Sequence, residues 1–173
     1  LAQKVIKKYN CKYASIDLPE ANLLSSYYLK SHFPEKKFIG NDQLSENTLN
    51  NDIFEKNDIF ILNPWNKLLD IKFDLIINTR SMMEMDTRII KEYFDLIHKI
   101  IDENGFFLNI NRYRKKSVGY PVHFFEYPYD ENWKVECSKS SWKQNWIHFL
   151  IVRRNKYNKE KSDIMKELKR IKI

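Results

Sequence analysis

A group of polar side chains directly follows an apolar segment near the middle of the chain. Residues 73–77 are apolar apart from Asp74. A buried strand that ends in polar side chains forms a ligand crevice in open α/β sheets, because ligands bind beyond the carboxyl ends of the strands. We therefore expect the functional site around residues 78–84. Its polar side chains are Asn78, Thr79, Arg80, Ser81 and Glu84.

A carboxylate follows a second predicted strand, over residues 12–16. Asp17 at that position could accept two hydrogen bonds from the vicinal hydroxyls of a ribose. Asp17 also precedes Pro19 and Glu20 at the start of a predicted helix, where an Asp N-cap is favoured. Ribose binding and helix capping are both open for this residue.

A third polar group emerges from a predicted strand over residues 106–110. Amide, guanidinium and aromatic side chains suit a carbohydrate, whose hydroxyls need donors and acceptors beside an apolar surface. The loop over residues 120–133 continues this pattern with many aromatic rings and His123. That loop could form an acceptor wall, or fold its rings back onto the core. The side chains at the strand's end are Asn109, Asn111, Arg112 and Tyr113.

Composition excludes several classes of function. The chain has 173 residues, 43% of them hydrophobic, which suits one domain with a normal core. It contains only three glycines and neither a GxGxxG nor a Walker loop, so a glycine-rich phosphate loop is excluded. No apolar run is long enough to cross a bilayer, and the start of the chain lacks a signal-peptide pattern, so a cytoplasmic location is the default. His32, His98 and His148 lack metal-ligand spacing, and we expect no metal site.

The net charge of +7 allows a polyanionic partner. Much of the excess lies in residues 153–172, where Ile164, Leu168 and Ile171 follow helical spacing. A C-terminal amphipathic helix with a solvated basic face accounts for this charge. A contact with a membrane surface or an anionic polymer is the alternative.

Helical and strand patterns alternate along the chain, which indicates a doubly wound, mostly parallel α/β sheet. An antiparallel strand pair closes the pattern, over residues 133–138 and 146–152. The remaining helices are expected at residues 1–9, 22–33 and 87–101, and strands at 12–16, 37–39, 59–62, 73–77 and 106–110.

Three segments resemble a known enzyme family: IDLPEANLLSSYYLKSHFP at residues 16–34, DLIINTRSMMEMD at 74–86 and GFFLNINRY at 105–113. They are similar to a family of sugar O-methyltransferases, which are class I S-adenosylmethionine-dependent enzymes of bacterial surface-polysaccharide loci. The resemblance covers residues 1–153, so we expect a methyltransferase-like domain there and a separate basic helix over residues 154–173. It implies methyl transfer from S-adenosylmethionine to a sugar hydroxyl.

The resemblance also implies a class I, Rossmann-like sheet of seven strands in the order 3-2-1-4-5-7-6, which accounts for the closing antiparallel pair. Residues 12–16 and 59–62 match strands two and three of that sheet. Residues 73–77 and 106–110 match strands four and five.

The resemblance further implies roles for individual residues. A sugar hydroxyl that attacks a methyl group needs a base or a metal to take its proton, and Glu84 and His123 are the candidates for that base. Glu84 could instead be an acidic residue favoured by the dipole at a helix N-terminus. The implied cofactor contacts are Asp17, Leu18, Asn78 and Thr79. The implied acceptor contacts are Arg80, Ser81, Arg112 and Tyr113.

This sequence departs from the family at one point. Class I methyltransferases place a glycine-rich turn after strand one, against the methionine part of the cofactor. Residue 1 already lies in the helix that should follow that turn, so we expect the cofactor site to be incomplete without a segment outside this sequence. The alternative function is a non-catalytic scaffold or interaction domain that binds no cofactor. We expect a small-molecule or glycan partner, no nucleic acid and no membrane span, and we leave homo-oligomer formation open.

Overall fold

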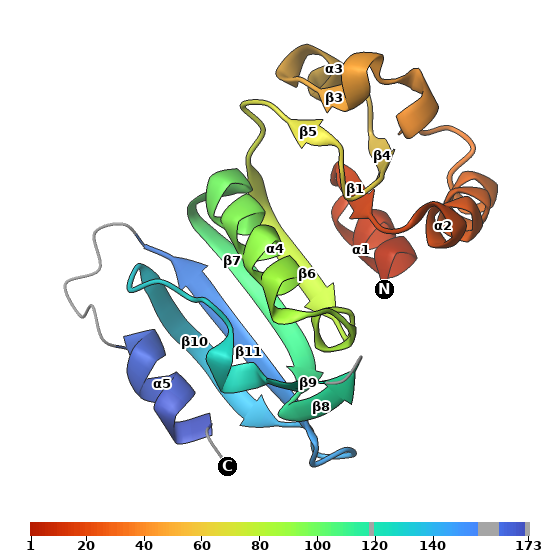
Figure 1. The fold of residues 1–173 in the computed structure, drawn as a ribbon. Coiled ribbons are helices and arrows are strands. Elements are labelled where there is room, and N and C mark those ends of the chain that lie inside the picture. The colour runs from red at the N-terminus through yellow and green to blue at the C-terminus, as the bar shows by residue number, and fades with distance from the viewer. Residues whose placement is uncertain (118–119, 156–162, 172–173) are drawn as a thin grey trace. The chain divides into compact units, whose positions relative to one another are not determined.

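The computed structural model describes residues 1–117, 120–155 and 163–171. The chain forms two compact units, Leu1–Ile71 and Lys72–Ile173, and each has strands and helices of its own (Figure 1). The division at residue 153 that the resemblance implies stays a prediction.

The first unit is built on a three-stranded parallel sheet in the order β1-β4-β2. All four residues of the central strand β4 are buried, as its uninterrupted apolar run predicts. Ile59 and Ile61 of that strand join Ile6, Leu29 and Phe33 in the core. The elements are α1 (Ala2–Tyr9), β1 (Tyr13–Ile16), α2 (Pro19–His32), β2 (Phe38–Gly40), η1 (Asn41–Gln43), η2 (Ser45–Asn47), β3 (Thr48–Leu49), α3 (Asn51–Lys56), β4 (Ile59–Leu62) and β5 (Lys67–Leu68).

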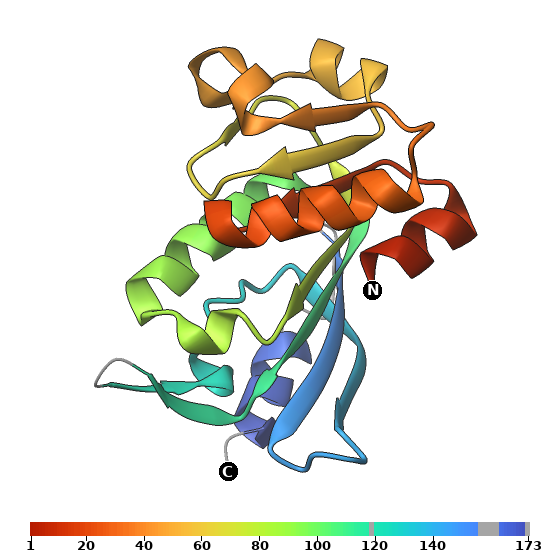
Figure 2. The same cartoon turned by 90° about the vertical axis from the view of Figure 1, so that its right-hand side faces the viewer.

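The second unit contains a mixed four-stranded sheet in the order β10-β11-β7-β6. Strands β6 and β7 are parallel, whereas β11 runs antiparallel to both β7 and β10. The β8–β9 hairpin projects away from this sheet (Figure 2). The elements are β6 (Phe73–Thr79), η3 (Met82–Glu84), α4 (Thr87–Ile100), β7 (Ile101–Arg112), β8 (Arg114–Ser117), β9 (Tyr120–His123), η4 (Phe124–Glu126), β10 (Trp133–Ser140), β11 (Ile147–Arg154) and α5 (Asp163–Ile171).

Two amphipathic helices close the core of the second unit. Helix α4 buries Ile90, Phe94, Ile97 and Ile100, and the Phe94 ring meets the buried Phe107 ring of β7 edge to face, with centroids 5.8 Å apart. Helix α5 buries the residues at helical spacing identified in the sequence, and it packs against β10. An amphipathic C-terminal helix is therefore confirmed over residues 163–171.

The doubly wound, mostly parallel sheet expected from the sequence is wrong. The described strands fall into four separate sheets: β1-β4-β2, β10-β11-β7-β6, β3-β5 and β8-β9. The largest of these is mixed rather than parallel. Hydrophobic periodicity identifies a strand from its own residues, but which strands share hydrogen bonds depends on contacts distant in sequence. The closing antiparallel pair is present as β10 and β11.

Candidate functional site

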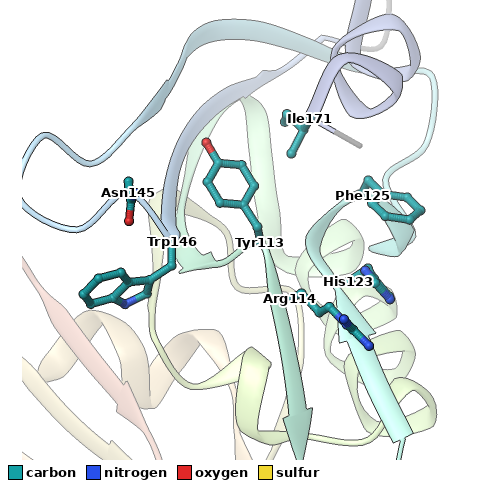
Figure 3. A pocket seen from close by; sticks show the side chains of 7 residues that line it. All are labelled: Tyr113, Arg114, His123, Phe125, Asn145, Trp146 and Ile171. Atoms are coloured by element: carbon teal, nitrogen blue, oxygen red, sulfur yellow. The ribbon is translucent and has the colours of Figure 1, made fainter. Parts of the chain in front are cut away.

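An open pocket of about 360 Å³ lies where the carboxyl end of β7 meets the amino end of β11, and we call it the Tyr113 pocket. Arg112 of β7 is paired with Ile147 of β11, which brings Tyr113 and Trp146 together at that edge. Figure 3 shows Tyr113 between Asn145 and Trp146 on one side and His123 and Phe125 on the other. The lining residues are Tyr113, Arg114, His123, Phe125, Asn145, Trp146 and Ile171.

The lining combines aromatic surface with polar groups. Trp146 is half exposed, and the His123 and Phe125 rings lie with centroids 5.1 Å apart. Arg114 brings a positive charge, and none of the seven lining residues carries a carboxylate. Flat rings beside a few hydrogen-bonding groups suit a hydroxyl-rich ligand of small size.

Behind the pocket, Tyr113 is held by a buried histidine. The hydroxyl of Tyr113 lies 2.9 Å from Nδ1 of His148 and 2.5 Å from Oγ of Ser140. His148 is only 2% exposed, and its burial lowers its pKa to about 4, so the imidazole is neutral at ordinary pH. Its Nε2 lies 2.9 Å from Oγ of Ser138.

The segment that the sequence indicated as the site, residues 78–84, is a hydrogen-bonded turn fastened to β7. Asn78 donates to Ser81 at 2.5 Å, and its amide oxygen accepts from Nδ2 of Asn111 at 2.9 Å. Asn111 in turn accepts from the backbone N–H of Met83 at 3.1 Å and donates to Asn109 at 2.5 Å. Both Asn109 and Asn111 are fully buried. Asn78 and these two residues therefore position the turn through their side chains.

Other predicted site residues lie outside the Tyr113 pocket. Glu84 pairs with Lys115 of β8. Arg80 has a φ of 63°, and its backbone N–H donates to the carbonyl of Ile110 at 2.8 Å. Thr79 is exposed, and Nε of Arg112 is buried without a hydrogen-bond partner among the described residues. Of the predicted catalytic and acceptor residues, the structure thus brings Tyr113 and His123 together.

In the first unit, Asp17 lies at the carboxyl end of β1 with an exposed carboxylate. Its Oδ1 accepts from the N–H of Leu18 at 2.8 Å. Leu18 itself occupies the N-cap position of α2, so helix capping is not the role of the Asp17 side chain. Ribose binding by the exposed Asp17 carboxylate stays a prediction.

The implied cofactor does not fit a complete site in this structure. Both polar side-chain atoms of Asn78 are engaged in the turn. Described residues therefore fit one ribose contact of S-adenosylmethionine and not the rest, and no reaction step is assigned through it.

A second pocket, of about 460 Å³, lies in the first unit at the carboxyl ends of β2 and β4. Asn22 is 5% exposed there and donates to the carbonyls of Asp17 and Leu62, both at 2.8 Å. Its amide oxygen has no hydrogen-bond partner among the described residues. Asp42 lies over Gly40, where an added Cβ would come within 2.6 Å of the carboxylate.

Comparison with known proteins adds no further assignment. No protein-family model matches the chain, and no curated protein matches it significantly. The resemblance to sugar O-methyltransferases therefore stays a prediction.

None of the described helices is long and apolar enough to cross a membrane. Across residues 1–117, 120–155 and 163–171, no group of three or more His, Cys, Asp or Glu side chains could hold a metal ion.

Sequence reasoning missed the residues behind and beside the pocket. His148 lies on β11 and Ser138 and Ser140 lie on β10, and only the pairing of β10 with β11 and of β11 with β7 brings them toward Tyr113. A signal was present for His148, since it is a buried polar residue in the apolar run 147–152. Trp146 and Asn145 carried no comparable signal.

Proposed function

We propose that this chain binds a carbohydrate in the Tyr113 pocket and forms the acceptor-binding part of an S-adenosylmethionine-dependent sugar O-methyltransferase of surface-polysaccharide biosynthesis. The observation that carries the proposal is the lining of the pocket. Three aromatic residues, Tyr113, Phe125 and Trp146, offer surfaces for the C–H faces of a sugar ring. Arg114, His123 and Asn145 offer hydrogen bonds for its hydroxyls.

The methyltransferase part of the proposal is supported by where the resembling segments lie. Residues 105–113 form most of β7 and lead directly into the pocket at Tyr113. Residues 74–86 form β6 and the turn that Asn78 and Asn111 fasten to β7. Residues 16–34 contain Asp17 and helix α2.

His123 is the stronger candidate for the base that receives the acceptor's proton. Its imidazole lines the pocket, as Figure 3 shows. Glu84 pairs with Lys115 and is not among the lining residues.

The engagement of both polar atoms of the Asn78 side chain in the turn favours a second candidate function. In that case the chain is a carbohydrate-binding interaction domain that transfers no methyl group. The two candidates share the Tyr113 pocket and differ in cofactor binding.

Calorimetry separates the candidates. The chain, and a version extended at its N-terminus, are titrated with S-adenosylhomocysteine and with methyl glycosides of the common hexoses and hexuronic acids. Sugar binding with cofactor binding by the extended version supports the methyltransferase. Sugar binding with no cofactor binding in either version supports the interaction domain. Absence of sugar binding in both versions contradicts both candidates.

A further inference from the structure

A continuous chain of hydrogen bonds runs from the surface helix α5 to the Tyr113 pocket. Glu167 of α5 accepts a hydrogen bond from the Ser138 hydroxyl of β10. Oγ of Ser138 lies 2.9 Å from Nε2 of His148 on β11. The other ring nitrogen of His148, Nδ1, lies 2.9 Å from the Tyr113 hydroxyl. Four side chains from separate parts of the unit thus form one line.

The direction of this chain is fixed at its acidic end. A hydrogen bond from Arg170 holds the pKa of Glu167 below its usual value, so the carboxylate is charged and can only accept. Ser138 must then donate its single proton to Glu167. Its oxygen is left to accept from His148, which places the imidazole proton on Nε2.

The tautomer of His148 in turn determines which atom accepts the hydroxyl proton of Tyr113. A neutral imidazole with its proton on Nε2 has a lone pair on Nδ1, which can only accept. The Tyr113 hydroxyl therefore donates to Nδ1, and Ser140, at 2.5 Å, donates to the Tyr113 oxygen. One lone pair of that oxygen remains free to accept a hydrogen bond. The Tyr113 hydroxyl has no further proton to donate.

We propose that this chain makes Tyr113 a dedicated hydrogen-bond acceptor in the pocket, so that the site selects a ligand hydroxyl able to donate to Oη. The inference rests on the proposed carbohydrate function and names its specificity-determining residue. His148 is a positioning residue, because it acts on the ligand through Tyr113. Ser138 and Glu167 hold the imidazole in the required tautomer.

Selection follows from what happens when the ligand hydroxyl is missing. A deoxy sugar leaves the Tyr113 oxygen without its donor, and an O-methyl sugar also brings a methyl group where a proton should lie. Because the pocket is open and water can enter, we expect the loss to be on the order of tenfold in affinity.

Tryptophan fluorescence provides the binding measurement, since Trp146 lines the pocket. The methyl glycoside that binds most tightly is compared with its monodeoxy and mono-O-methyl derivatives. One position of the sugar should show the loss of about tenfold. Tyr113→Phe should bind the parent and that derivative equally.

Two variants of His148 separate positioning from simple structural support. His148→Asn keeps an acceptor oxygen near the position of Nδ1 and should retain the preference for the hydroxyl. His148→Phe removes the acceptor, frees Tyr113 to donate, and should lose the preference for the hydroxyl over the O-methyl derivative, whose ether oxygen can accept. Tyr127→Phe is the matched control, because the Tyr127 hydroxyl has no hydrogen-bond partner among the described residues and lies outside the pocket.

The outcomes are distinct. If sugars bind and Tyr113→Phe or His148→Phe keeps the preference, the inference is wrong while the carbohydrate function stands. Nitrogen NMR that finds the His148 proton on Nδ1 contradicts the inference in the same way, without any ligand. If no glycoside binds to the unaltered chain, both the proposed function and the inference fail.

Discussion

The charge of the Tyr113 pocket depends on one lining residue, Arg114. Arg114 is exposed, and neither an ion pair nor a hydrogen bond of its side chain is found among the described residues. The seven lining residues include no acid that would oppose an anionic ligand. A sugar that carries a carboxylate should therefore gain an attraction that a neutral sugar does not.

Replacing Arg114 tests this attraction. Arg114→Gln should weaken binding of a methyl hexuronide roughly two- to fivefold, the range expected for an exposed charge pair, and leave the neutral hexoside unchanged. Fluorescence titration at low and high salt measures the effect, which should shrink as salt rises. Lys116→Gln, an exposed cation on β8 outside the pocket, is the control. An equal loss for both sugars would show that Arg114 acts through hydrogen bonds or shape and not through its charge.

His148 also links stability to pH. Because its folded pKa of about 4 lies below the ordinary value of 6.5, the unfolded chain binds its proton more readily than the folded chain does. Its contribution to the free energy of unfolding is full above about pH 6.5 and declines as the pH falls toward 4. The groups that face His148 include Tyr113, Ser138, Glu167 and Arg170. All four remain in the variant His148→Asn, which serves as the comparison.

Urea denaturation between pH 7 and pH 4 measures this dependence. The unaltered chain should lose more stability over that interval than His148→Asn, which has no proton to bind. Equal slopes for the two proteins would contradict a neutral buried histidine.

Among the elements, helix α4 begins at Thr87 because the residue before it, Asp86, caps the helix N-terminus. Asp86 precedes the helix, and its carboxylate accepts from the N–H of Arg88 at 2.7 Å. The helix carries Phe94 into the core against β7, so its position supports the strand that leads to Tyr113. Asp86 therefore stabilises the helix that packs against β7, although it lies outside the pocket.

Asp86→Ala should lower the free energy of unfolding by about 1 kcal/mol, since one helix N–H loses its partner. Thermal or urea denaturation provides the measurement. Glu92→Ala, an exposed acidic residue within the same helix, should change stability far less. A loss as large for Glu92→Ala would assign the effect to charge instead of capping.

The whole chain contains two units with separate cores. The second unit has its own mixed sheet, two packed helices and the complete Tyr113 pocket. Its buried set includes large side chains such as Trp133, Phe94 and Phe107, which suits independent folding.

A chain of residues 72–173 alone should therefore fold cooperatively and bind the same glycoside with unchanged affinity. Circular dichroism and fluorescence titration measure the two properties. A folded fragment that no longer binds sugar would show that the pocket depends on residues of the first unit.

Local patterns in the sequence determined the elements. Spacing of apolar residues predicts the buried stripe of α4, the helix α5 and the strands β4 and β6, because each pattern depends on neighbours along the chain. The same local view placed Tyr113 and His123 among the acceptor residues, and both line the pocket.

Tertiary structure alone decided which strands pair and which polar residues meet. Asn78 and Asn111 are 33 positions apart and are joined by a hydrogen bond. Asn78 is a predicted cofactor contact, but this bond attaches the turn over residues 78–84 to β7. Tyr113 and His148 are 35 positions apart, and only the pairing of β7 with β11 brings them together. Periodicity records which face of an element is buried, whereas the partner buried against it depends on contacts between distant segments.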